Sequence, residues 1–288
     1  MSNVKILVCA HKKGEYVRSD GVFTPVHGGR ALSQADLGIQ GDDTGDNISR
    51  KNPNYCELTV LYWAWKNLRN VDYIGLNHYR RYFLYKDIPV RNMITRTPDE
   101  YIYKMSDTSF EPEKHMNGYD IIMPKPWSLS YSPAVQYCLV HSRTDYAALR
   151  TIVKQSSPDY YDAFINTMEG QNKISYGNMF ITRREIFDDY CSWIFPLLSN
   201  LEIKIADRVK GYDTYQARIY GFLSERLMNV YVLKNKLKVK YHPVVFLSND
   251  GAAADRPLLK LLADRARYGA LFALDGLMFK KGGVLHTV

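Results

Sequence analysis

One short segment of the chain gathers the residue types that bind charged ligands. Residues 72–83 read DYIGLNHYRRYF, in which an apolar run gives way to a polar and aromatic cluster. Guanidinium groups match phosphate oxygens in a bidentate geometry, so two adjacent arginines beside a histidine could hold a phosphate. Arginine pairs are also common on surface loops, and the pattern alone leaves that alternative open. The cluster consists of Asn77, His78, Tyr79, Arg80, Arg81 and Tyr82.

The apolar runs before the polar residues predict where those residues lie. Residues 73–76 read as a short β-strand, and a strand that ends in polar side chains places them at the carboxyl edge of a sheet, where open α/β sheets bind ligands. Residues 5–10, KILVCA, read as a first buried strand that ends at His11 and Lys12. No glycine-rich phosphate fingerprint follows this strand, so the pattern does not specify a nucleotide.

Three further residues are candidates for acid–base chemistry. Glu57 opens the helical pattern YCELTVLYWAWKNL among aromatic residues. A carboxylate enclosed in such a cleft could act as an acid or base, whereas a solvent-facing one is an ordinary first-turn residue. His141 and Asp145 are four residues apart in a helical pattern, so we expect them on one helix face. The pair could form an imidazole base oriented by a carboxylate, or an ion pair on the helix surface.

An acidic stretch, GDDTGDNIS at 41–49, could contribute metal ligands through Asp43 and Asp46. Residues of these types are also turn formers, and we predict no metal site here. The surrounding residues 14–54 are rich in Gly, Asp, Asn, Ser and Pro. We therefore expect this segment to be a long irregular loop, a length at which loops are usually functional or disordered.

The composition points to an anionic partner. The 288 residues carry a formal net charge of +8, which favours nucleotide diphosphates, anionic membrane surfaces or nucleic acids. No zinc-finger or RNP-like signature is present, so we expect no nucleic-acid partner. The 23 tyrosines suit a sugar or nucleotide cleft but serve equally well as core residues.

The cysteines and apolar segments bear on the cellular compartment. Four cysteines without a CxxC pair predict neither a zinc site nor a disulfide framework. The N-terminal apolar run is too short for a signal peptide, and no window reaches the ~20 apolar residues of a membrane-spanning helix. We expect a cytoplasmic protein. Its basic amphipathic C-terminal segment either packs on the domain or contacts the inner face of the membrane.

Predicted strands and helices alternate along the chain. The pattern favours an α/β fold, a single Rossmann-like domain whose mixed, mainly parallel sheet is flanked by helices. Residues 86–117 read as an insertion that carries a helix. The other expected elements are strands at 118–126, 179–181 and 230–233, helices at 184–198 and 212–228, and a closing segment at 238–246.

The chain resembles a family of bacterial capsular and exopolysaccharide glycosyltransferases, long known only as a domain of unknown function. The resemblance runs from the first strand to about residue 246, which implies a domain at 1–246 and a basic helical extension at 247–288. It implies a GT-A-like fold, with some members linked to galactofuranosyl or galactosyl transfer. The matching stretches are HK (11–12), GDDTGDNISRKN (41–52), YCELTVLYWAWKN (55–67), YIGLNHYRRYF (73–83), YDIIMPKP (119–126), GNMFITRREIFDDYCSWIF (177–195) and RIYGFLSERLMNVYV (218–232).

The resemblance also implies roles for particular residues. In GT-A enzymes an Asp-x-Asp motif holds a divalent metal on the donor diphosphate, and the segment around Asn77 stands in its place without an acidic pair. We therefore expect arginine and histidine to take over much of the metal's role, with Mn²⁺ or Mg²⁺ still open as a cofactor. Glu225 and Arg226 are expected to pair as an internal brace. The implied donor-binding residues are His11, Lys12, Asp46, Asn47, Asn77, His78, Tyr79, Arg80, Arg81 and Asn178.

The implied activity is transfer of a hexose from a UDP-sugar to a glycan or lipid-linked acceptor in capsule, O-antigen or exopolysaccharide synthesis. An inverting transfer needs a base, for which Asp145, Glu57, His141 and Asp213 are candidates. One competing hypothesis is a nucleotide-sugar hydrolase or pyrophosphorylase. Another is a non-catalytic nucleotide- or glycan-binding subunit of a polysaccharide assembly complex. The donor sugar, the acceptor, the anomeric outcome and the oligomeric state stay open.

Overall fold

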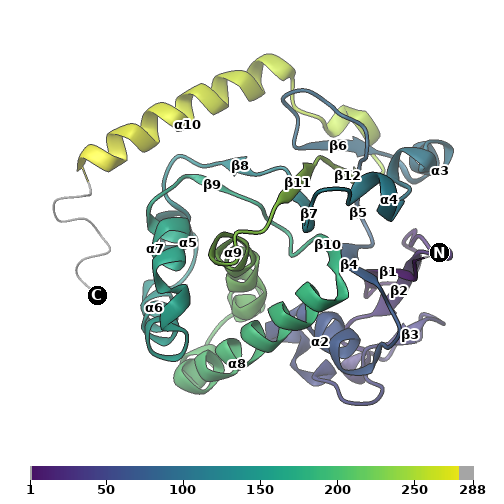
Figure 1. Cartoon of the computed structure of the whole chain (residues 1–288), viewed down its shortest axis with the longest axis horizontal. Helices are drawn as coiled ribbons and strands as arrows, with labels where there is room; N and C mark the ends of the chain where they lie inside the picture. The colour runs from purple at the N-terminus through teal and green to yellow at the C-terminus, as the bar shows by residue number, and fades with distance from the viewer. Residues whose placement is uncertain (1, 279–288) are drawn as a thin grey trace.

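A ten-stranded mixed sheet forms the centre of the computed structural model, which describes residues 2–278 (Figure 1). A separate two-stranded sheet pairs β8 with β9. The strands are β1 (Val4–Ala10), β2 (Phe23–His27), β3 (Gln40–Gly41), β4 (Tyr73–His78), β5 (Arg81–Phe83), β6 (Met93–Arg96), β7 (Ile121–Pro124), β8 (Trp127–Ser128), β9 (Lys173–Ile174), β10 (Phe180–Arg183), β11 (Val239–His242) and β12 (Val244–Leu247).

Helices cover both faces of the sheet, and short 3₁₀ turns connect several of them. The α-helices are α1 (Asn52–Tyr55), α2 (Leu58–Asn67), α3 (Pro98–Tyr103), α4 (Pro112–His115), α5 (Pro133–Val140), α6 (Arg143–Ser156), α7 (Tyr161–Glu169), α8 (Arg184–Val209), α9 (Ile219–Lys234) and α10 (Leu258–Met278). The 3₁₀ turns are η1 (Arg30–Leu32), η2 (Ser49–Lys51), η3 (Met105–Thr108), η4 (Pro158–Tyr160), η5 (Gln216–Arg218) and η6 (Gly251–Ala254).

The strand order brings several chain segments to one edge of the sheet. The main path runs β11-β7-β10-β4-β1-β2-β3, and β1 pairs in parallel with both β2 and β4. Strand β10 is antiparallel to both β4 and β7, so β7 and its parallel partner β11 run in the same direction as β4. The carboxyl ends of these parallel strands and the start of β10 therefore share an edge. The predicted α/β fold with a mixed, mainly parallel sheet is confirmed.

Two hydrophobic cores lie on opposite faces of the sheet. Leu7 and Cys9 of β1 face a core formed with α2, α8, α9 and the α5–α7 helices. Ile6 and Val8 face a second core that includes β5, β12 and α3. Because successive strand residues point to opposite faces and both faces are covered, β1 reads as a continuous apolar run rather than an alternating one.

Two predicted secondary-structure assignments were wrong. Residues 14–54 are not all loop, because Phe23–His27 form β2 beside β1; Pro25 within this short run argues against a strand. Residues 230–233 are not a strand but the last turns of α9. Their apolar sequence fits a strand, yet α9 is buried on nearly every side, so no amphipathic period marks it as a helix.

The expected shared helix face of His141 and Asp145 was also wrong. His141 follows the last residue of α5, in an extended conformation with φ −130° and ψ −177°. Ser142 then caps α6 by accepting a hydrogen bond from the backbone N–H of Asp145. A serine N-cap begins a new helix at this point, and the pattern of side chains across the junction does not show the break.

The helix α10 crosses the outside of β8 (Figure 1). Arg265 donates a hydrogen bond of 2.7 Å to the Asn92 side-chain oxygen, and Asp255 accepts one of 2.7 Å from the Thr95 backbone. Within residues 2–278 no helix combines the length and apolar character needed to cross a membrane. The domain boundary at residue 246 stays a prediction.

Candidate functional site

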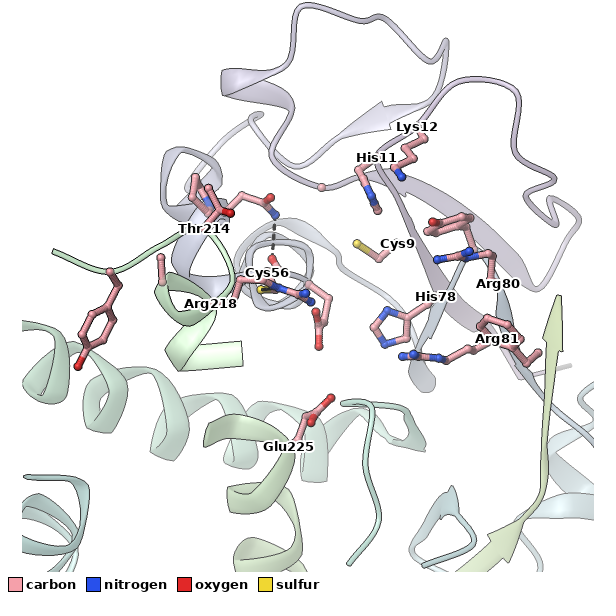
Figure 2. Close-up of a pocket in the computed structure, with 18 residues that line it drawn as sticks. Cys9, His11, Lys12, Cys56, His78, Arg80, Arg81, Thr214, Arg218 and Glu225 are labelled. Carbon is pink, nitrogen blue, oxygen red and sulfur yellow. Dashed lines mark hydrogen bonds between the residues drawn. The ribbon is translucent and has the colours of Figure 1, made fainter. Parts of the chain in front are cut away.

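A cavity of about 700 Å³ opens at the carboxyl ends of β1 and β4 (Figure 2). Its size lies within the range of small-molecule sites. The turn after β1, the polar cluster after β4, helix α1 and the start of α9 supply its walls. Its charged and histidine residues are Lys12, Arg80, Arg81, Arg218, His11, His78, Glu57 and Glu225.

Four cations give the cavity an excess of positive charge. Arg81 and Lys12 approach from the β4 and β1 side, and Arg218 approaches from the opposite side. Among residues 2–278 the ion pairs include none of these four side chains. Arg80 lies against aromatic faces, 5.0 Å from the Tyr79 ring centre and 5.5 Å from that of Phe246. These guanidinium groups are therefore positioned without protein carboxylates and suit an anionic ligand.

His78 is neutral and fixed in one tautomer. Its Nε2 atom lies 2.5 Å from the Gly177 carbonyl oxygen, and because a carbonyl only accepts, Nε2 carries the hydrogen. Burial lowers the pKa of His78, an effect that the nearby Glu57 charge opposes. The histidine connects the end of β4 to the turn before β10, and its Nδ1 is left as an acceptor.

The turn at residues 177–178 binds both carboxylates of the cavity. Gly177 and Asn178 adopt φ values of +100° and +50°, which glycine and asparagine tolerate best. The Gly177 N–H donates to Glu225 over 3.1 Å, and the Asn178 amide donates to Glu57 over 2.6 Å. Asn178 is fixed in turn by the Ser224 hydroxyl, which donates to its side-chain oxygen over 2.9 Å.

Glu225 has the chemistry of a general base at neutral pH. Enclosure in the cavity and the nearby Glu57 charge raise the pKa of Glu225 to about 7. Arg226 points away from it, donating over 2.6 Å to the Gln136 side chain. The predicted Glu225–Arg226 ion pair was wrong, because adjacent helical residues project about 100° apart around the helix.

The two thiols of the cavity are not activated nucleophiles. Burial and the Glu57 charge raise the pKa of Cys56 to about 12, although the Arg218 guanidinium lies 3.3 Å from its sulfur. Burial likewise raises the pKa of Cys9. A thiol attacks only as its thiolate, so these cysteines line the cavity in an inert form.

The cavity contains seven of the residues chosen from the sequence. His11 packs edge-on against Tyr79, with ring centres 5.3 Å apart. Burial and the neighbouring cations Lys12 and Arg80 lower the pKa of His11. Asn178 lies directly behind the cavity as the hydrogen-bond donor to Glu57. The predicted residues that line the cavity are His11, Lys12, Glu57, His78, Tyr79, Arg80 and Arg81.

Three candidate bases lie outside this cavity. The Asp213 carboxylate accepts hydrogen bonds from the backbone N–H groups of Tyr215 and Gln216. Both Asp145 oxygens are occupied, one by the Arg208 guanidinium at 2.9 Å and the other by the Tyr212 hydroxyl at 2.5 Å. His141 bonds to Gln216 over 2.8 Å and stacks on neighbouring aromatic rings. None of the three side chains lines the cavity, and the contacts of Asp145 and His141 are those of groups that connect helices.

Three of the donor-binding predictions also fall outside the cavity. Asn77 is buried on the opposite face of the sheet from His78, because neighbouring strand residues alternate. Asp46 accepts a hydrogen bond from the Tyr62 hydroxyl over 3.2 Å, and Asn47 donates to backbone oxygens within its own turn. None of the three lines the cavity.

Sequence reasoning missed Arg218 as a site residue and treated Glu225 as structural. Arg218 immediately precedes α9, and Glu225 lies two turns further along that helix. Both are far from the other cavity residues in sequence, so no local motif predicts their approach. The only available signal was that the family-like stretch 218–232 begins at Arg218.

The wall of the cavity at the end of β4 carries no acidic side chain. Within the described part of the chain, no group of three or more His, Cys, Asp or Glu side chains is arranged to hold a metal ion. The end of β4, where GT-A enzymes carry an acidic pair, presents His78, Arg80 and Arg81 instead. Hard cations prefer clustered oxygen ligands, which this wall lacks.

Comparisons with known proteins agree with this architecture. One solved structure, described as the apo structure of the bifunctional glycosyltransferase WbbM, matches with a TM-score of 0.78 and 33% sequence identity. The match covers 89% of this chain and 47% of that chain, so this chain spans about half of its neighbour's length. No curated protein matches this chain. The model of the family described as "Domain of unknown function (DUF4422)" matches residues 5–236, and the chain belongs to this family.

Proposed function

We propose that the chain is a glycosyltransferase that transfers a hexose from a UDP-sugar to a glycan or lipid-linked acceptor. The observation that carries the proposal is the cavity at the carboxyl edge, where unpaired cations face a pair of carboxylates. The likeness to a bifunctional glycosyltransferase at 33% identity supports the same class of activity. The cations can bind the donor diphosphate, and a carboxylate can accept the proton of the acceptor hydroxyl.

In the proposed reaction the acceptor oxygen attacks the anomeric carbon of the donor sugar. The bond from that carbon to the β-phosphate oxygen breaks, and UDP leaves with the electron pair. Arg81, Arg80 and Arg218 stabilise the charge that develops on the leaving diphosphate. Glu225 accepts the proton of the acceptor hydroxyl, since a pKa near 7 suits a base at neutral pH. His78 and Asn178 position the turn and the two carboxylates.

The finer assignments from the sequence stay part of this proposal. They are galactofuranose or galactose as the hexose, and capsule, O-antigen or exopolysaccharide as the product. Contact with the inner face of a membrane belongs with them, because a lipid-linked acceptor is found there. The arginines would stabilise the diphosphate without an acidic pair, which supports transfer that does not depend on Mn²⁺ or Mg²⁺.

The test is release of UDP when the protein is mixed with UDP-hexoses and acceptor oligosaccharides. We expect UDP release that requires both substrates and is lost in Glu225→Gln, while this variant still binds UDP. If Glu225→Gln transfers normally, the base assignment is wrong. Binding of UDP without UDP release across a broad donor and acceptor panel would contradict the enzyme proposal and favour the alternative, a non-catalytic nucleotide- or glycan-binding subunit.

A further inference from the structure

A second cavity, of about 670 Å³, lies between helix α10 and the body of the domain. Its floor comes from β8, the segment after β8 and the end of α5, and its side from β6 and the segment before it. Helix α10 passes over this region (Figure 1). Nothing in the proposed transfer reaction uses this cavity so far.

Four aromatic side chains are among the residues that line the second cavity. Trp127, at 37% exposure, lies on the floor with Tyr131, and Tyr176 and Tyr268 contribute from the turn before β10 and from α10. A partly exposed tryptophan in a concave site offers a ligand a large apolar face. Flat aromatic faces suit the C–H faces of sugar rings, and their polar tips can bond to hydroxyl groups.

Polar groups are distributed around these rings. Gln136 accepts hydrogen bonds from the Tyr176 hydroxyl and from the Arg226 guanidinium, at 3.3 and 2.6 Å. At the α10 side, Arg256 and Asp264 form an ion pair of 3.1 Å. Aromatic faces beside hydrogen-bonding groups suit a glycan, whose rings carry both apolar C–H faces and hydroxyl groups.

Neighbouring residues of the β5-β12-β6 extension line the two cavities. The strand pairing places Arg81 opposite Phe246 and Phe246 opposite Thr95, so these three side chains lie on one face of the β5-β12-β6 extension. Arg81 and Phe246 line the first cavity, and Thr95 lines the second. Two strand spacings of about 4.8 Å separate the backbones of Arg81 and Thr95, or ~10 Å in all.

A second connection runs through the turn before β10. Tyr176 lines the second cavity, and the next residue, Gly177, bonds to His78 and to Glu225 in the first. Adjacent residues of this turn therefore contact the two cavities.

We propose that the second cavity, the acceptor groove, binds the glycan part of the acceptor over several sugar rings. The proposal rests on the proposed function, because it assigns the residues that hold the acceptor while its terminal hydroxyl meets Glu225. Trp127 and Tyr268 supply the stacking faces. The groove thereby makes binding depend on the length of the acceptor chain, whereas the first cavity alone can hold only the reacting end.

The test is calorimetric titration of the full-length protein with galacto- and manno-oligosaccharides of one to six rings. We expect the dissociation constant to fall at least tenfold between one ring and four. Trp127→Ala and Tyr268→Ala should remove this gain and leave the titration with UDP unchanged. Tyr103→Ala is the matched control, since this tyrosine is 87% exposed and lies in neither cavity.

Several outcomes would overturn the groove assignment. These are absence of oligosaccharide binding, affinity that does not change with chain length, or a length effect that survives both variants. Binding of phosphatidylglycerol vesicles that requires Trp127, with no binding of oligosaccharides, would assign the groove to a lipid instead. Length-dependent glycan binding without UDP-hexose consumption would leave the groove intact and contradict the proposed transfer. UDP release with the same acceptor KM in all variants would support the proposed transfer and contradict the groove assignment.

Discussion

Asp145 and Glu225 are two enclosed carboxylates with opposite surroundings. Asp145 is 1% exposed at its side chain, and its two oxygens accept from Arg208 and Tyr212. Glu225 accepts from the Gly177 backbone and faces a cavity with unpaired arginines, and burial together with the nearby Glu57 charge raises its pKa to about 7. Both oxygens of the Asp145 carboxylate have hydrogen-bond partners within the protein, whereas the Glu225 carboxylate can exchange a proton near neutral pH.

The difference shows what distinguishes a structural carboxylate from a candidate catalytic one. Asp145 has the spacing to a histidine that suggests an acid–base pair in the sequence, yet its contacts connect α6 to the last turn of α8 and to the segment after it. Glu225 has no such spacing, yet its pKa and its cavity suit a base.

Replacing Glu225 by Gln should have the largest effect. The amide cannot accept the acceptor proton, so we expect the rate of transfer to fall about 10²- to 10⁴-fold, measured as UDP release. The dissociation constant of UDP should change little. Asp145→Asn is the matched control and should keep most of its activity per folded molecule. The comparison fails if Asp145→Asn loses transfer while Glu225→Gln retains it.

The pH profile of transfer should carry the signature of Glu225. Since the base must be deprotonated, the rate should rise about tenfold per pH unit at low pH and level off above about 7. The pKa of Glu225 is raised in the folded state, so its contribution to stability is present below the unfolded pKa and is lost as the pH rises through about 7. Thermal unfolding of Glu225→Gln should therefore depend less on pH between 5 and 8. A flat rate profile across this range would contradict the base role.

Asp145→Asn should instead lower stability. The change weakens a buried charged contact between helices, and we expect the free energy of unfolding to fall by about 1–3 kcal/mol, measured by urea denaturation. UDP affinity should stay the same. A variant as stable as the wild type but unable to bind UDP would place Asp145 in the donor site after all.

Asn77→Leu should have the smallest effect, with the opposite sign. Within residues 2–278 neither polar atom of the Asn77 side chain has a hydrogen-bond partner, and the residue is buried. A leucine of similar size removes that penalty, so the free energy of unfolding should rise by about 1 kcal/mol with UDP affinity unchanged. Loss of UDP binding in Asn77→Leu would support its predicted donor role.

Asn178→Leu, in contrast, loses the hydrogen bonds of Asn178 to Glu57 and Ser224. We expect this variant to lower both stability and transfer.

The parts of the fold that the sequence predicted correctly rest on local patterns. The apolar runs of β1 and β4 and the polar residues after them sufficed to place His11, Lys12, His78, Arg80 and Arg81 at one sheet edge. Strand β2 was not predicted, because a proline interrupts a five-residue run. The end of α9 was taken for a strand, because a helix buried on most sides lacks an amphipathic period.

The rest of the site depends on contacts between distant segments. Arg218 and Glu225 reach the cavity because α9 packs beside α1, a pairing that no short-range spacing encodes. The pKa of Glu225 is raised by burial and by the charge of Glu57, a residue 168 positions earlier. Likewise, the serine cap at Ser142 separates His141 from Asp145 although their spacing fits one helix.

We propose that the first cavity binds a nucleotide diphosphate through arginine rather than through a metal ion. The most direct test of this proposal is calorimetric titration with UDP in the presence of EDTA, for the wild type, Arg81→Ala and the exposed control Arg69→Ala. We predict that UDP binds despite the chelator, that Arg81→Ala weakens binding about 10- to 100-fold, and that Arg69→Ala has no effect. Binding that EDTA abolishes and Mn²⁺ restores, or an Arg81→Ala variant with wild-type affinity, would contradict the account.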